Sequence, residues 1–116
     1  MANEIKRAVR VAEGLREELA QLVGQKVRDP GVSGVVVSRV ELTDDLRSAK
    51  VYFRLLDATR RAEAEAGLAR ASGMLRREVT KTLKLRVAPE LRFFYDEGQD
   101  KLDRVAALLA EIKRGE

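Results

Sequence analysis

The sequence of 116 residues contains no cysteine and no histidine. Without cysteine, disulfide bonds, thiol nucleophiles and thiolate metal sites are excluded. Without histidine, the chain lacks the side chain that proteins use most often for acid–base catalysis and for binding zinc. Any enzyme built from this sequence would depend on carboxylates, lysine, tyrosine or hydroxyl groups.

Long apolar runs are also missing. The first residues have no apolar stretch of signal-peptide length, and no segment approaches the ~20 apolar residues of a membrane span. The length fits one domain, residues 1–116, which can bury a core without disulfides. We therefore expect a single cytoplasmic domain that is monomeric and does not associate with a membrane.

Positive charge is concentrated in one segment. The chain has 23 Lys and Arg residues against 19 Asp and Glu residues, a net charge of +4. Between positions 69 and 92, only Glu78 and Glu90 oppose the basic residues Arg70, Arg76, Arg77, Lys81, Lys84, Arg86 and Arg92. A basic segment of this kind favours contact with nucleic acid.

Apolar spacing predicts the order α-β-β-α-β-α, an α+β fold with a three-stranded sheet. Residues 5–23 have helical periodicity, and Asp29-Pro30-Gly31 predicts a turn. Residues 35–42 form the first predicted strand, with Val36, Val40 and Leu42 facing inward. The alternation of residues 48–55 predicts the second strand of a hairpin, whose outer face carries Arg39, Lys50 and Arg54.

The second half of the chain predicts two helices and one strand. A helical region should begin near Thr59 as N-cap and end at Ala88-Pro89. The strand Leu91–Tyr95 follows, and a short helix carries the last apolar residues, from 102 to 112. We expect strands 48–55 and 91–95 to be parallel, with the helices on one face of the sheet.

The most informative pattern is a basic stripe on the second helical region. On a helical wheel, Arg70, Arg77, Lys81 and Lys84 fall within about 60° of each other, opposite the apolar residues. Such a line of cations can neutralise successive phosphates. The alternative is an ordinary solvated face, but such faces usually interleave charges, and here the interleaving stops at Arg70.

Two further features are candidates. Lys6, Arg7 and Arg10 lie in the first turns of the first helix, where the helix dipole disfavours cations, so they are either functional or merely exposed. Ala71-Ser72-Gly73 could break the second helix and create a phosphate-binding N-terminus near Met74. The local pattern alone favours an uninterrupted helix with a tolerated glycine.

Acidic and aromatic residues give no sign of a catalytic or metal site. The spacing of Asp96, Asp100 and Asp103 does not match a calcium-binding loop. The strand patterns contain five aromatic residues, Tyr52, Phe53, Phe93, Phe94 and Tyr95. We expect Phe53, Phe93 and Tyr95 in the core, and they do not resemble the base-stacking pairs of an RRM sheet. We predict no catalytic residue, no metal and no cofactor.

Several short segments together resemble the bacterial ribosome-binding factor A family. They occur in the family's order over residues 5 to 112 and are Arg7-Ala-Val-Arg-Val, Asp29-Pro30, Asp45-Leu-Arg-Ser-Ala-Lys-Val-Tyr52, Gly73-Met-Leu-Arg76 and Leu85-Arg-Val-Ala-Pro-Glu-Leu-Arg-Phe93 with Asp96. This family has a type II KH-like fold in which an Ala-x-Gly kink, here Ala71-Ser72-Gly73, replaces the usual Gly-x-x-Gly loop. The resemblance therefore implies a real kink and the order α-β-β-α-(kink)-α-β, followed by the short C-terminal helix. Some members also carry a longer charged C-terminal tail, whereas this sequence stops at Glu116.

The resemblance implies a ribosome assembly factor that is not an enzyme. It would bind the free small (30S) ribosomal subunit and 16S rRNA and assist late maturation, including processing of the 5′ end of 16S rRNA. The family is also linked to growth in the cold. The expected RNA-binding residues are Lys6, Arg7, Arg10, Arg70, Ala71, Ser72, Gly73, Arg76, Arg77, Lys81, Lys84 and Arg86.

Two alternatives stay open. A generic KH-type protein that binds single-stranded RNA would prefer short strands to folded subunits. A protein–protein module would dock a partner on the first or the last helix, and loss of the basic stripe would leave its binding unchanged.

Overall fold

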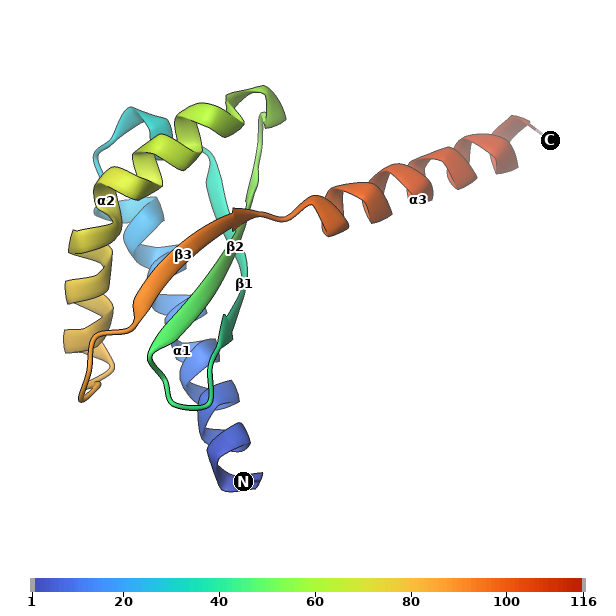
Figure 1. Ribbon diagram of the computed structural model, residues 1–116. Helices are drawn as coiled ribbons and strands as arrows, with labels where there is room; N and C mark the ends of the chain where they lie inside the picture. Colours follow the sequence, from blue (N-terminus) through green and yellow to red (C-terminus); the bar gives the residue numbers. More distant parts are fainter. Residues whose placement is uncertain (1, 116) are drawn as a thin grey trace.

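The elements follow the predicted order in the computed structural model (Figure 1). They are α1 (Ala2–Gln25), β1 (Val35–Leu42), β2 (Ser48–Leu55), α2 (Arg61–Thr82), β3 (Glu90–Tyr95) and α3 (Glu97–Gly115), with the 3-10 turns η1 (Pro30–Val32) and η2 (Ala58–Arg60). The structure describes residues 2–115, without the side chains of Ala2, Gln99, Asp100, Lys101 and Asp103. No helix in this range is long and apolar enough to cross a lipid bilayer.

The three strands form one mixed sheet with β2 in the centre. β1 pairs with β2 in the antiparallel sense and β3 pairs with β2 in the parallel sense, which confirms both predictions. In β2, Ala49, Val51 and Phe53 are fully buried and alternate with more exposed residues. One face of the sheet is therefore inside the protein, and the α+β class is confirmed.

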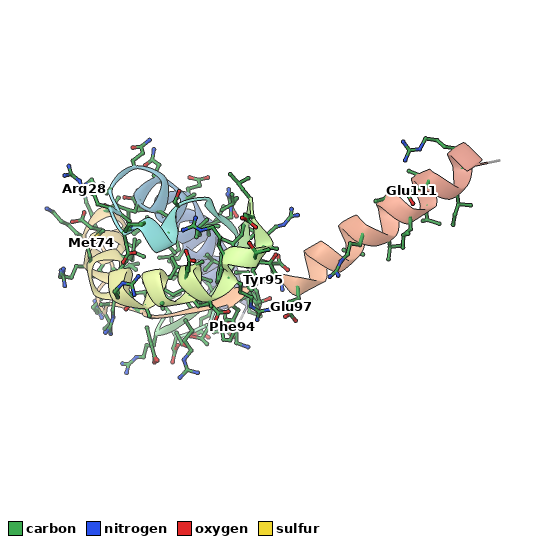
Figure 2. All side chains as sticks on the ribbon, turned by 90° about the horizontal axis from the view of Figure 1, so that it is seen from above. Arg28, Met74, Phe94, Tyr95, Glu97 and Glu111 are labelled. Carbon is green, nitrogen blue, oxygen red and sulfur yellow. The ribbon has the colours of Figure 1, made fainter. Side chains whose placement is uncertain are left out.

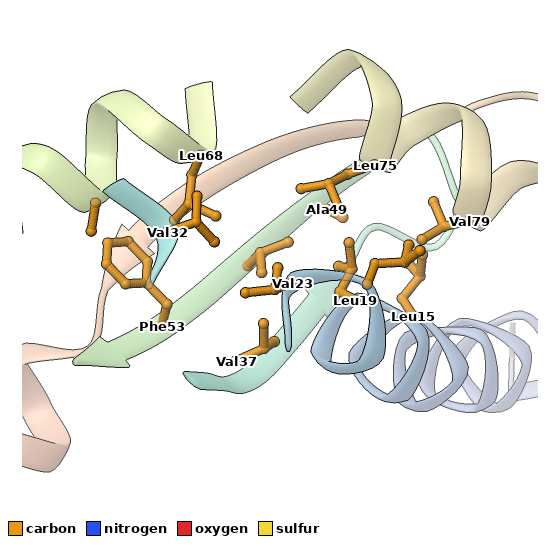
Figure 3. Packing of buried hydrophobic residues seen from close by; sticks show 13 residues of the cluster. Leu15, Leu19, Val23, Val32, Val37, Ala49, Phe53, Leu68, Leu75 and Val79 are labelled. Carbon is orange, nitrogen blue, oxygen red and sulfur yellow. The ribbon is translucent and has the colours of Figure 1, made fainter. Parts of the chain in front are cut away.

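The core lies between this face and the helices α1 and α2. α1 contributes Leu15 and Leu19, and α2 contributes Leu68, Leu75 and Val79, all fully buried (Figure 3). Burial of a side chain of this size stabilises a fold by roughly 1.5–3 kcal/mol. Because the apolar side of α2 is buried in this core, the basic side of the helix faces solvent.

The prediction that Val36 faces the core is wrong. Val36 is 49% exposed and Val37 is 6% exposed. Val37 pairs with Phe53 and Arg39 pairs with Tyr52, so Ser38 is an extra residue in β1. Such a β-bulge reverses the alternation, which places Val37 inward before the bulge and Val40 and Leu42 inward after it.

The predicted ends of α2 also need correction. Thr59 is not the N-cap; its N–H and hydroxyl donate to the carboxylate of Asp57, which caps η2. At the other end, α2 stops at Thr82 and not at Ala88-Pro89. Lys84 adopts a left-handed conformation with φ of 53°, and the Leu85 N–H donates to the Thr80 carbonyl, which ends the helix.

The helix α2 bends without breaking. Residues 71–73 are α-helical, so no new N-terminus forms near Met74. Nevertheless, the axis of α2 changes direction about midway along the helix (Figure 1). The Ser72 hydroxyl donates to the Ala69 carbonyl, a bond that competes with the helical ladder, and Gly73 follows directly. Serine–glycine pairs of this kind commonly bend helices.

α3 is longer than predicted and does not cover the sheet. It has 19 residues and projects away from the rest of the protein, beginning beside Tyr95 and Glu97 (Figures 1 and 2). Its apolar side chains Leu102, Val105, Leu108, Leu109 and Ile112 are 53–66% exposed. The prediction that all helices pack on one face therefore holds for α1 and α2 but not for α3.

Candidate nucleic-acid interface

The second half of α2 forms the basic edge of a shallow groove. The groove is lined by Gly73, Arg76, Arg77, Thr80, Lys81 and Ala88. Arg77 and Lys81 lie one turn apart on α2 and are exposed, because the residues opposite them, Leu75 and Val79, are buried in the core. Gly73 adds no side chain to the groove, so its floor is open between the cations and the loop at Ala88.

Two cations that line this groove, and two more in the loop that follows α2, have no partner of opposite charge among the described residues. Among the described residues, no hydrogen bond or ion pair involves the side chain of Arg77, Lys81, Lys84 or Arg86. The nearest acidic residue in sequence, Glu78, instead forms an ion pair of 3.8 Å with Lys26, toward α1. The positive charge of this region is therefore available to an external anion.

The first half of α2 differs from the second. Arg60 pairs with Glu63 at 3.1 Å, and Arg61 pairs with Glu65 at 2.9 Å and with Glu97 at 2.6 Å. The i,i+3 and i,i+4 pairs among these neutralise one another on the helix surface. The charges that interleave in the sequence before Arg70 are therefore ion-paired in the structure, whereas Arg77 and Lys81 further along the helix are not.

Arg70 is held within the protein. Its guanidinium donates to both carboxylate oxygens of Asp29, at 2.6 and 3.0 Å, and the Gly31 N–H donates to the same carboxylate at 2.9 Å. These bonds, chiefly those from Arg70, lower the pKa of Asp29 from 3.8 to about 2. Arg70 thus joins α2 to η1 and is not one of the unpaired cations.

Arg76 also has a local role. Its guanidinium donates to the Ala88 carbonyl at 2.9 Å and so ties the loop between α2 and β3 to the helix. This bond helps to place Lys84 and Arg86, which belong to that loop and not to the helix. The helical-wheel position predicted for Lys84 is therefore wrong, although Lys84 is exposed next to the groove-bearing helix.

The other predicted site residues vary in exposure. Gly73 is exposed, whereas Ala71 and Ser72 are half-buried. Lys6, Arg7 and Arg10 are exposed on α1. Arg7 and Arg10 precede Gly14 by two turns and one turn on the same side of α1, and Gly14 lies against Leu83 at the end of α2. Arg7 and Arg10 therefore extend from the side of α1 that meets the end of α2.

The described acidic residues do not form a metal centre. The described residues contain no group of three or more acidic side chains that could hold a metal ion. The Asp96 carboxylate is buried and lies 3.0 Å from the Ser38 hydroxyl. The side chains of Asp100 and Asp103, weighed with Asp96 as ligands, lie outside the described residues.

One feature was missed by the sequence interpretation. Tyr52 and Phe94 meet on the face of the sheet away from α1 and α2, with ring centroids 5.8 Å apart. Tyr52 lies between the buried residues Val51 and Phe53, and Phe94 lies between the half-buried residues Phe93 and Tyr95. The register that makes them adjacent, Tyr52 opposite Phe94, is a property of the parallel pairing and has no local sequence signal.

Comparison with known proteins, by family model and by individual relatives, identifies the same family. The family model described as ribosome-binding factor A matches residues 7–109. A protein of that name from Sorangium cellulosum is 55% identical over 119 aligned positions, which cover 99% of this chain and 95% of the relative.

Solved structures match the fold. The crystal structure of ribosome-binding factor A from Thermus thermophilus superposes with a TM-score of 0.69 at 24% identity, over 76% of this chain and 94% of that one. Coordinates of the Thermus thermophilus factor, a homology model fitted into the cryo-EM map of a 30S–RbfA complex, superpose with a TM-score of 0.57 at 25% identity. They match over 70% of this chain and 86% of that one.

Proposed function

The chain belongs to the ribosome-binding factor A family, and we propose that it binds the free 30S ribosomal subunit through the groove beside α2. The observation that carries this proposal is an open groove lined by two unpaired cations, Arg77 and Lys81. The loop that follows α2 adds two more, Lys84 and Arg86. A related protein is described in a complex with the 30S subunit. The phosphates of 16S rRNA are the ligands that such cations would contact.

The proposed contact is mainly electrostatic. Each cation that neutralises a phosphate releases a condensed counterion, so binding should weaken as the salt concentration rises. Contacts to phosphates fix position and orientation but carry little sequence information. Recognition of the subunit would then depend on the spacing of several phosphates in folded rRNA. Arg7 and Arg10 would add contacts on the α1 side.

We further propose that the protein assists late maturation of the 30S subunit in the cytoplasm, including processing of the 5′ end of 16S rRNA. It would act by binding, without catalysis and without a cofactor. A role in growth at low temperature is consistent with this proposal, because misfolded RNA rearranges more slowly in the cold. The family name and the basic groove support the binding step on which these roles depend.

The test replaces Arg77, Lys81 and Lys84 with alanine. The triple variant should bind 30S subunits more weakly, and the slope of log affinity against log salt should flatten by about 0.9 per lost phosphate contact. Co-sedimentation with purified 30S subunits across a salt series measures both quantities. Thermal melts should show little change, because exposed substitutions usually shift stability by within ~0.5 kcal/mol.

A matched control removes the same charge elsewhere. Arg28, Arg47 and Lys113 are exposed and lie in three different parts of the molecule. Their triple alanine variant has the same net charge as the first, and we expect it to keep most of the affinity and the salt slope. Equal binding by the two variants at every salt concentration would show that the α2 groove is not the interface.

A further inference from the structure

The open face of the sheet carries a row of three side chains across its strands. Arg39 of β1 is paired with Tyr52 of β2, and Tyr52 is paired with Phe94 of β3. The rings of Tyr52 and Phe94 are 5.8 Å apart with their planes tilted by 34°. The Arg39 guanidinium carbon lies 4.1 Å from the centre of the Tyr52 ring. The row therefore presents one continuous planar and cationic surface.

Cations lie on both sides of this row. On one side of the row, Lys50 of β2 lies opposite Arg92 of β3 in the strand register. On the other side lies Arg54 of β2. Glu41 pairs with Arg39 at 3.4 Å and Glu90 pairs with Arg92 at 3.2 Å. Lys50 is exposed with no hydrogen bond or ion pair among the described residues, so this face carries at least one unpaired cation.

This face lies opposite the α2 groove. α1 and α2 pack on the side of the sheet that carries Val51 and Phe53, whereas Phe94 is 40% exposed on the other side. A ligand on the row would therefore not compete for the cations of α2. The two surfaces can be tested separately.

Cross-strand aromatic pairs also stabilise sheets. That role explains the contact between Tyr52 and Phe94, but it does not require cations on both sides of the pair. Exposed rings flanked by cations are the combination that proteins use for single-stranded nucleic acid: bases stack on the rings, and the cations follow the backbone.

We propose that the open face of the sheet binds an unpaired segment of ribosomal RNA. One base stacks on Phe94 beside Tyr52, and neighbouring phosphates are held by Lys50 and Arg92. The proposal rests on the proposed function for the identity of the RNA, but it assigns a second contact on a separate face. It also gives a role to an aromatic pair on a face that covers no core.

The test uses fluorescein-labelled oligoadenylate and oligouridylate of about ten nucleotides, a length within the range that single-strand-binding domains cover. Phe94→Leu and Tyr52→Leu remove a ring but keep apolar bulk, and Tyr52→Phe keeps the ring. Fluorescence anisotropy at low salt should show affinity about tenfold weaker for each leucine variant, equivalent to about 1.4 kcal/mol. Tyr52→Phe should bind like the unmodified protein.

Leu56→Ala is the control for loss of an exposed apolar side chain, since Leu56 is 86% exposed just after β2. It should leave oligonucleotide affinity unchanged. In the unmodified protein, NMR signals of the Tyr52 and Phe94 rings should shift on titration with oligoadenylate. This readout remains decisive even if a leucine variant fails to fold.

The outcomes separate the two proposals. If oligonucleotides leave the ring signals of Tyr52 and Phe94 unmoved, or bind Phe94→Leu as tightly as the unmodified protein, the aromatic row only joins strands. The α2 proposal would then be tested only by the triple alanine variant of Arg77, Lys81 and Lys84. If that variant binds subunits normally while Phe94→Leu loses oligonucleotide affinity, the α2 groove is excluded and the sheet face is retained.

Discussion

Gly67 and Gly73 lie in the same helix but have different surroundings. A Cβ atom on Gly67 would lie 3.0 Å from Val32 and 3.2 Å from the backbone of Gly31, so α2 meets η1 there without room for a side chain. A Cβ atom on Gly73 would meet only the end of Arg77, at 3.6 Å. The two glycines therefore have different physical reasons to be present.

We predict opposite effects of alanine at these two positions. Gly67→Ala should lower the free energy of unfolding by roughly 1–3 kcal/mol, because it overpacks the contact between α2 and η1. Gly73→Ala should be neutral or raise it by up to ~1 kcal/mol, because alanine favours the helix and meets no obstacle. Urea denaturation of both variants measures the difference. A loss at Gly73 as large as that at Gly67 would mean that the bend of α2 requires glycine.

The ion pair between Asp29 and Arg70 should appear in the pH dependence of stability. Folding lowers the pKa of Asp29 to about 2, below its unfolded value near 3.9. Its stabilising effect is therefore complete above pH ~4 and is lost as the pH falls toward ~2. Asp29→Asn should be less stable than the unmodified protein at neutral pH and should show a smaller loss of stability between pH ~4 and ~2.

Asp44→Asn is a suitable control for this prediction, since Asp44 is an exposed carboxylate in the turn between β1 and β2. It should retain the full acid-dependent loss of the unmodified protein. Denaturation curves at several pH values compare the three proteins. If Asp29→Asn loses stability with acid as steeply as the unmodified protein, the pair with Arg70 does not form in solution.

The same two residues show how far the site could be predicted. The density of cations in residues 69–92 is a local property, so the sequence predicted a basic surface there. The partner of Arg70 is 41 residues away in the sequence, and no periodicity reports it. The hydrogen bond from Arg76 to the Ala88 carbonyl likewise has no signal in the sequence periodicity. The sequence located the cations but could not tell which of them are free.

At the scale of elements, clean alternation was the most reliable signal. β2 alternates without interruption and was predicted with its correct bounds and buried face. In β1 the run Val35-Val36-Val37 has no alternation, so its inward residues depend on the bulge at Ser38. The bulge places the Ser38 hydroxyl near the buried Asp96 carboxylate, 58 residues away. Neither the bulge nor this contact has a local signal.

The end of α2 was missed because its terminating residue is unusual. Helices commonly end with glycine in the left-handed conformation, and here Lys84 takes that role. The sequence offered Pro89 as the only obvious terminator, although the helix has already ended at Thr82. This early end places Lys84 and Arg86 in the loop between α2 and β3 and not on the helix.

At the scale of the whole molecule, the domain is thin enough to have two usable faces. Its smallest extent is 19 Å, and its largest, 57 Å, includes the projecting α3 (Figure 1). The basic groove lies on the helical layer and the aromatic row lies on the bare side of the sheet. A molecule of this shape could contact two RNA segments at once. Simultaneous contacts raise the effective affinity without making either one strong.

The projecting helix gives the last prediction. The apolar side chains of α3 are more than half exposed, so they contribute little to the core. One link between α3 and the domain is the surface ion pair between Glu97 and Arg61, and such pairs contribute about 0–1 kcal/mol. Removal of residues 99–116 keeps that pair and should change the free energy of unfolding by less than ~1 kcal/mol.

Leu68→Ala provides the contrast for this truncation, because Leu68 is fully buried between α2 and the sheet. It should cost roughly 2–5 kcal/mol, although it removes far fewer atoms. Urea denaturation and co-sedimentation with 30S subunits should be measured on both variants. If α2 forms the interface, the truncated protein should still bind subunits with its salt dependence intact. A stability loss near that of Leu68→Ala would instead show that α3 folds back onto the domain in solution and buries its apolar side there.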